Sequence, residues 1–149
     1  MYLRILSGAV LAFVACTSLA AGEPATATAI TTQSVNVRAG PVKDFPPVTW
    51  LLSGKTVTVV GCVESWRWCD VIYGRDRGWV YARHLALNVD GRKMSILQGG
   101  PATGLPVIPF EVGPYWQAHY TGRTFMSRQL YWQTRWDRRV PAPEWRARP

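Results

Sequence analysis

Cysteine is the residue type in this chain with the widest range of chemistry, and there are three: Cys16, Cys62 and Cys69. Six residues separate Cys62 from Cys69, so this pair is not the C-x-x-C motif of a redox enzyme. No histidine lies nearby in the sequence to complete a zinc site with the two thiols. Read as an antiparallel hairpin, the surrounding stretch places the two cysteines directly opposite each other, at a separation that a disulfide can bridge. We therefore predict a structural disulfide.

The same hairpin register pairs Val60 with Val71 and places both on the face of the two sulfur atoms. Val59 and Ile72 then face the opposite side of the sheet. Closing a loop of this length should stabilise the fold by about 2.5 kcal/mol. For a small domain this is a large share of the free energy of unfolding.

Other catalytic chemistry finds little support in the sequence. The only histidines, His84 and His119, belong to no recognisable triad, and the nine acidic residues include no close pair suited to glycoside hydrolysis. The motifs of serine hydrolases, zinc proteases and nucleotide-binding loops do not occur. We therefore predict that the protein is not an enzyme and that it holds neither a cofactor nor a metal.

The first twenty residues have the pattern of a secretory signal peptide. Arg4 supplies a positive charge, residues 5–15 are apolar, and Ser18-Leu19-Ala20 fits the cleavage site. An alternative is lipidation, because Phe13-Val14-Ala15-Cys16 is similar to the lipobox of bacterial lipoproteins and would make Cys16 an acylated N-terminus. Either reading predicts a periplasmic or secreted protein, and lipidation would anchor it to the outer membrane.

Short strands are the main elements that the sequence predicts after the leader. Residues 21–32 are rich in Ala and Thr and read as a flexible tether. Alternating polar and apolar residues then predict five strands, at 34–38, 48–52, 56–63, 66–73 and 78–81. Five strands at this spacing, with polar turns between them, predict an all-β fold with a small closed barrel rather than an open sheet.

Six landmarks occur in order along residues 33–87: Val35-Asn36-Val37-Arg38-Ala39-Gly40-Pro41, Leu52-Ser53-Gly54-Lys55, Val60-Gly61-Cys62, Trp68-Cys69-Asp70-Val71, Gly78-Trp79-Val80 and Leu85. Together they resemble the bacterial SH3-like (SH3b) domain family. The resemblance implies an SH3-like β-barrel that serves mostly as a targeting or binding module in secreted and cell-envelope proteins. Members of the family with known ligands tend to recognise cell-wall peptides or their crosslinks.

Aromatic residues are the candidates for ligand contact. We expect Trp79 in the core, because a short strand must bury its largest side chain. Trp66 and Trp68 should share one strand face, near the irregular loop that contains Phe45. The predicted ligand groove consists of Phe45, Trp50, Trp66, Trp68 and Tyr73. The alternative is that these rings seal the ends of the barrel.

Residues 88–149 have a different composition and are predicted to be a Gly/Pro connector followed by a basic, aromatic extension. Residues 88–92 read as a turn at the boundary of the barrel. Pro106-Val107-Ile108-Pro109 could form a polyproline II helix and dock on the barrel of the same chain. One short helix is expected between Pro114 and Gly122, and a second is possible at 125–136.

Positive charge is concentrated in this extension. Residues 123–149 hold seven Arg against two acidic residues, with Trp132, Trp136 and Trp145 interleaved. Arg and Trp together favour an anionic membrane surface as a partner, although a solvated basic tail has the same composition. The export signal argues against nucleic acid as a partner.

These patterns predict a non-catalytic, secreted or envelope binding module that recognises a cell-wall peptide, a glycan or another envelope component. Two alternatives stay open. The first is a scaffold subunit whose extension docks on another envelope protein. The second is an interfacial membrane binder that acts through the Arg/Trp-rich tail.

Overall fold

The computed structural model describes residues 25–139. The predicted signal peptide, Cys16 and the beginning of the predicted tether lie outside the described residues, as does Trp145.

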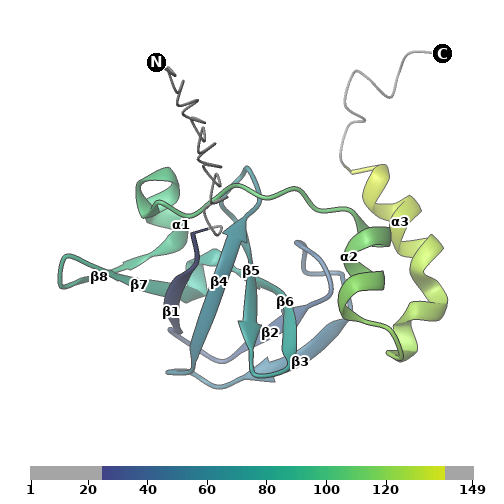
Figure 1. Ribbon diagram of the computed structural model, residues 1–149, viewed down its shortest axis with the longest axis horizontal. Helices are drawn as coiled ribbons and strands as arrows, with labels where there is room; N and C mark the ends of the chain where they lie inside the picture. Colours follow the sequence, from purple (N-terminus) through teal and green to yellow (C-terminus); the bar gives the residue numbers. More distant parts are fainter. Residues whose placement is uncertain (1–24, 140–149) are drawn as a thin grey trace, which may run out of the picture.

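One antiparallel sheet of eight strands forms most of the described structure (Figure 1). The strands are β1 Ala27–Thr31, β2 Val35–Arg38, β3 Pro47–Leu51, β4 Thr56–Cys62, β5 Trp68–Tyr73, β6 Asp76–Tyr81, β7 Leu85–Val89 and β8 Arg92–Ser95. Their order in the sheet is β3-β2-β6-β5-β4-β1-β7-β8. All five predicted strands are present, as β2 to β6. The predicted closed barrel is wrong, because the sheet has three further strands and its edge strands, β3 and β8, do not pair with each other.

Strand β1 corrects the tether prediction for residues 21–32. Residues Ala27–Ile30 pair with β4, and Ile30 and Thr31 pair with β7. Ala29 and Thr31 point inward and are buried. The Thr31 hydroxyl donates to the carbonyl of Leu52 at 2.7 Å and accepts from the amide of Lys55 at 2.9 Å. Small alternating residues therefore form a strand where the composition alone suggested a linker.

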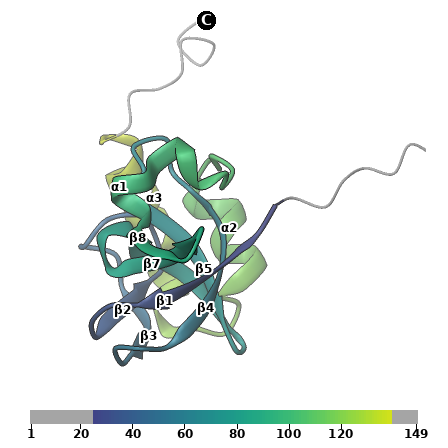
Figure 2. The ribbon, with the colours of Figure 1, turned by 90° about the vertical axis from the view of Figure 1, so that its left-hand side faces the viewer.

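The turn at residues 88–92 also has a different role from the one predicted. Asp90 and Gly91 have φ angles of +50° and +77° and connect β7 to β8 in a tight hairpin. This conformation explains the Asp-Gly pair, which is a typical sequence for such turns. Figure 2 shows this hairpin beside β1, with α1 (Ile96–Gly99) above it. The sheet therefore continues through the predicted boundary.

The hairpin of β4 and β5 carries the predicted disulfide between Cys62 and Cys69, which pair directly across the two strands. The predicted register holds for this end of the hairpin only. A bulge at Val60 shifts the register, so that Val59 and not Val60 lies opposite Val71. Val59 and Val71 are both fully buried, whereas Val60 is partly exposed. The bulge returns Cys62 to the buried face.

The connector docks on β4 immediately after this bulge. The amide of Cys62 donates to the carbonyl of Pro106 at 3.0 Å, and the amide of Ile108 donates to the carbonyl of Cys62 at 2.8 Å. Gly61 makes the approach possible, because a Cβ atom there would lie 2.7 Å from the Pro106 carbonyl oxygen. The Pro106–Pro109 segment therefore docks on the sheet of its own chain through backbone pairing.

Two longer helices follow the connector, α2 (Val112–His119) and α3 (Gln129–Asp137). They confirm the helix predicted after Pro114 and the second one that was considered possible. Three short 3-10 helices complete the described elements: η1 Ala82–His84, η2 Gly100–Thr103 and η3 Thr124–Arg128. In Figure 1 the connector crosses the sheet from α1 to α2, and both C-terminal helices lie together at one side of the sheet.

The apolar interior has two parts. The first core lies within the curved sheet and includes Val37, Val59, Val71 and Leu85. The second core lies between the sheet and the extension, and its buried members are Ala39, Phe45, Val48, Trp79, Phe110, Val112, Trp116 and Tyr120. Trp79 is fully buried, as predicted. Trp116 of α2 is also fully buried, and its indole nitrogen donates to the Ala39 carbonyl at 2.7 Å.

A buried polar network joins α2 to the sheet. The Asp70 carboxylate is fully buried and accepts from the Arg77 guanidinium at 2.6 and 2.9 Å and from the Tyr115 hydroxyl at 2.6 Å. The Tyr120 hydroxyl donates to the Arg77 carbonyl at 2.8 Å. Burial raises the pKa of Asp70, against the hydrogen bonds from Arg77 and Tyr115, which lower it. Burial also raises the pKa of Tyr115, so this side chain keeps its proton at neutral pH.

Replacing Tyr115 by Phe should weaken this network without creating a cavity. The buried Asp70 carboxylate would lose one donor, so we expect Tyr115→Phe to lower the free energy of unfolding by about 1–3 kcal/mol. Urea denaturation followed by tryptophan fluorescence measures this change. Tyr131→Phe is the matched control, because Tyr131 is 48% exposed and its loss should cost less than about 0.5 kcal/mol. Equal stability of the two variants would contradict the role assigned to the hydrogen bond.

Candidate functional site

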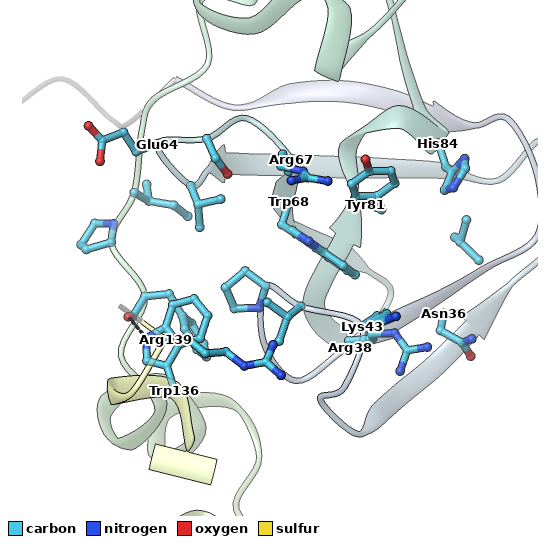
Figure 3. Close-up of a pocket in the computed structure, with 18 of the residues that line it drawn as sticks. Asn36, Arg38, Lys43, Glu64, Arg67, Trp68, Tyr81, His84, Trp136 and Arg139 are labelled. Carbon is cyan, nitrogen blue, oxygen red and sulfur yellow. Dashed lines mark hydrogen bonds between the residues drawn. The ribbon is translucent and has the colours of Figure 1, made fainter. Parts of the chain in front are cut away.

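A cleft of about 1460 Å³ lies between the sheet and the extension (Figure 3). Its lining includes residues from β2 and the loop after it, and from the turn between β4 and β5. Connector residues Val107–Glu111 and the end of α3 complete the lining. This volume exceeds the roughly 300–1000 Å³ of a typical small-molecule pocket. The shape suits part of a polymer or an extended peptide.

Three rings form a row along the cleft. Trp68 and Tyr81 are directly opposed residues of β5 and β6, and their ring centroids are 5.5 Å apart. His84, in η1, packs edge-on against Tyr81 at 5.5 Å. Trp68 and Tyr81 are both partly exposed, so each presents ring surface to the cleft. Antiparallel pairing of β5 with β6 is what brings the first two rings together.

Charged side chains surround this row. The cations that line the cleft are Arg38, Lys43, Arg67 and Arg139. Three acidic residues also line it: Glu64, Glu111 and Asp137. Figure 3 shows Arg67 on one side of the Trp68 ring and Lys43 and Arg38 toward the other, with Glu64 at the far end. Burial, followed by the charge of Arg83, lowers the pKa of His84. The imidazole is therefore neutral at pH 7 and adds no charge to the cleft.

Of the five residues predicted to form a ligand groove, the structure brings only Trp68 to this cleft. Phe45 is buried in the second core, where it stacks on Trp132 with centroids 5.0 Å apart. Trp50 is 57% exposed on the edge strand β3 and lies outside the cleft lining. Tyr73 is the last residue of β5 and packs against the first core.

Trp66 corrects the prediction that it shares a strand face with Trp68. It lies in the turn before β5 and has a φ angle of +57°, so the strand alternation does not extend to it. Its side chain packs against the first core, whereas that of Trp68 packs against the second. The two rings therefore serve different parts of the molecule.

Sequence reasoning missed several residues of the cleft. Tyr81, His84, Arg67, Lys43 and Arg38 line it but were not predicted as site residues. Only Tyr81 had a usable signal, because extending the β5–β6 hairpin back from its turn places it opposite Trp68. The others reach the cleft through loops and through the packing of the extension, which local patterns do not specify.

No group of three or more His, Cys, Asp or Glu side chains within residues 25–139 could hold a metal ion. No helix in the same range is both long enough and apolar enough to cross a bilayer.

Two ion pairs hold α3 at the edge of the cleft. The Asp44 carboxylate, in the loop before β3, accepts from the Arg135 guanidinium at 2.9 Å and also from that of Arg139. The hydrogen bonds from these two arginines lower the pKa of Asp44. Because Trp136 and Arg139 line the cleft, the position of α3 sets its width on this side.

Acid should loosen this attachment. A carboxylate whose pKa is lower in the folded state contributes stability above its unfolded pKa of about 3.9 and loses it as the pH falls further. We expect acrylamide to quench tryptophan fluorescence more strongly below about pH 4 than at pH 7. At pH 7, Asp44→Asn should have the same effect. Asp90→Asn in the exposed β7–β8 turn is the control, and equal quenching in both variants would contradict the assignment.

Comparison with known proteins gives one match. Residues 33–86 match the family described as bacterial SH3 domain. No significant match exists among curated proteins or among solved structures. The matched range runs from Gln33, two residues before β2, to Ala86, the second residue of β7. It therefore contains Trp68, Tyr81 and the disulfide. Residues 33–86 of this chain are therefore similar to bacterial SH3 domains, which confirms the resemblance seen in the sequence.

Proposed function

We propose that the protein is a non-catalytic binding module of the bacterial cell envelope, which holds a cell-wall peptide or glycan in the cleft at Trp68. The observation that carries this proposal is the partly exposed Trp68–Tyr81 pair, in a cleft formed by a bacterial SH3-like domain and its extension. Bacterial SH3 domains commonly bind cell-wall components and are generally not catalytic.

The lining of the cleft supports a ligand with alternating apolar and polar groups. The ring faces of Trp68 and Tyr81 offer flat apolar surface to a sugar ring or an aliphatic side chain. Gln33, Ser34 and Asn36 bring amide and hydroxyl groups to the same cleft, and these groups can both donate to and accept from peptide bonds or sugar hydroxyls. Such a surface recognises a polymer without reacting with it.

Export is part of the proposal. The pattern of residues 1–20 supports a signal peptide, and Cys16 offers a lipid anchor to the outer membrane as the alternative. The disulfide between Cys62 and Cys69 is consistent with an oxidising compartment, in which such bonds form and persist. The module would then meet its ligand in the periplasm or outside the cell.

Removing the Trp68 ring should abolish most of the binding. We expect the wild-type protein to bind soluble peptidoglycan fragments, and Trp68→Ala to weaken this binding by about tenfold or more. Isothermal titration calorimetry measures the affinity. Trp50→Ala is the matched control, because Trp50 is an exposed ring outside the cleft. Absence of binding by the wild-type protein, or equal loss in the two variants, would refute the proposal.

A second candidate function, contact with an anionic membrane surface, has its own support in α3. Leu130 is 79% exposed and Tyr131 is 48% exposed, and the Arg128 guanidinium lies over the Tyr131 ring at 4.7 Å. Exposed apolar groups next to arginine suit the interface of an anionic bilayer.

The membrane candidate predicts salt-sensitive binding to phosphatidylglycerol vesicles. Leu130→Asp should reduce the bound fraction in a sedimentation assay, because it removes apolar surface and adds a negative charge. Leu52→Asp, at another exposed leucine, is the control. If Leu52→Asp reduces sedimentation as much as Leu130→Asp does, contact through α3 is excluded.

A further inference from the structure

Three of the four cations that line the cleft form no ion pair among the described residues. Within residues 25–139, the ion pairs include Arg139, which contacts Asp44, but none of Arg38, Lys43 and Arg67. The Arg38 guanidinium donates to the Phe45 carbonyl at 2.9 Å. This bond fixes the position of Arg38 and leaves its charge uncompensated.

These three cations come from separate segments and line the same cleft as Trp68. Arg38 ends β2, Lys43 lies in the loop between β2 and β3, and Arg67 directly precedes Trp68. Figure 3 shows Arg67 on one side of Trp68 and Lys43 and Arg38 toward the other. Glu64 lies at the opposite end of the cleft, beside the connector. A ligand group next to Trp68 therefore meets positive charge from two sides.

We infer that the ligand of this cleft is an extended peptide with a free carboxylate. The carboxylate binds beside Trp68, to the cationic side chains of Arg67, Lys43 and Arg38. This inference rests on the proposed function and specifies its ligand. A guanidinium presents a planar pair of donors that matches a carboxylate, and an ammonium adds a point charge. The amides of Gln33 and Asn36 line the cleft and can bind the peptide bonds that precede the carboxylate.

A neutral ligand fits this lining less well. Filling the cleft displaces water from the charged groups, and that loss costs free energy unless the ligand supplies acceptors. A carboxylate supplies them, whereas the corresponding amide replaces one of its acceptors with donors that face other donors. The lining therefore selects for charge as well as for shape.

The test compares peptidoglycan fragments before and after conversion of their carboxyl groups to primary amides. We expect amidation to weaken binding to the wild-type protein by about tenfold or more, because charge-assisted hydrogen bonds are lost. Equal affinity for both forms would overturn the inference while the proposed function stands. Failure of both forms to bind would overturn the two together.

Substitution of the cationic side chains tests whether they bind the carboxylate of the ligand. Arg67→Gln and Lys43→Gln should each weaken binding of the untreated fragments and leave binding of the amidated fragments unchanged. Arg92→Gln, at an exposed arginine on β8 outside the cleft, is the matched control and should alter neither. Equal losses for untreated and amidated fragments would overturn the assignment to these residues.

Competition with inorganic phosphate tests whether the cleft prefers a phosphate group to a carboxylate. A carboxylate site of this kind should keep its affinity for fragments in millimolar phosphate at constant ionic strength. Displacement of the fragments by phosphate under these conditions would show that the cleft prefers a phosphate group, and would overturn the choice of a carboxylate.

Discussion

A carboxylate that water cannot reach, that of Asp70, sets the arrangement of the whole molecule. An ionised group in such a place is stable only when donors surround it, and here Arg77 comes from β6 and Tyr115 from α2. Since Asp70 itself belongs to β5, the requirement ties two strands and a helix to one point. The extension is thereby part of the folded unit. It also forms one wall of the cleft, so the site depends on the same constraint.

The second core explains why the extension is needed. Trp79 sits in the matched SH3-like range, but the side chains that cover it include Phe110 and Tyr115 from beyond that range. The connector reaches them by pairing with Cys62, next to a glycine that gives it room. The disulfide holds this end of β4 to β5. The backbone pairing at Cys62, the disulfide and the second core thus together attach the connector and α2 to the sheet.

The sequence was informative where patterns are local and misleading where they are not. The disulfide and strands β2 to β6 follow from alternation and spacing, and the burial of Trp79 follows from the size of its ring in a short strand. The SH3-like resemblance came from the order of six sequence landmarks. Strand β1 was missed because Ala and Thr resemble a linker in composition, although their alternation fits a strand. The bulge at Val60 lies next to Cys62, where the connector pairs with β4. Spacing within one hairpin cannot reveal a contact with a segment so far along the chain. For the same reason only Trp68 of the predicted groove reaches the cleft, since the opposite wall comes from residues about forty to seventy positions away.

The path of the connector has a consequence for how such a protein changes over evolution. Part of the cleft lining, including Trp68 and Tyr81, belongs to residues 33–86. The rest, including Val107–Glu111 and Trp136, comes from residues that follow this range. The SH3-like range and the folded unit therefore end at different points. Residues 33–86 transferred alone to another protein would bring Trp68 and Tyr81 but would leave Trp79 without the Phe110 and Tyr115 rings that cover it. Conversely, substitutions in the later segment alone can change the lining of the cleft while residues 33–86 stay unchanged.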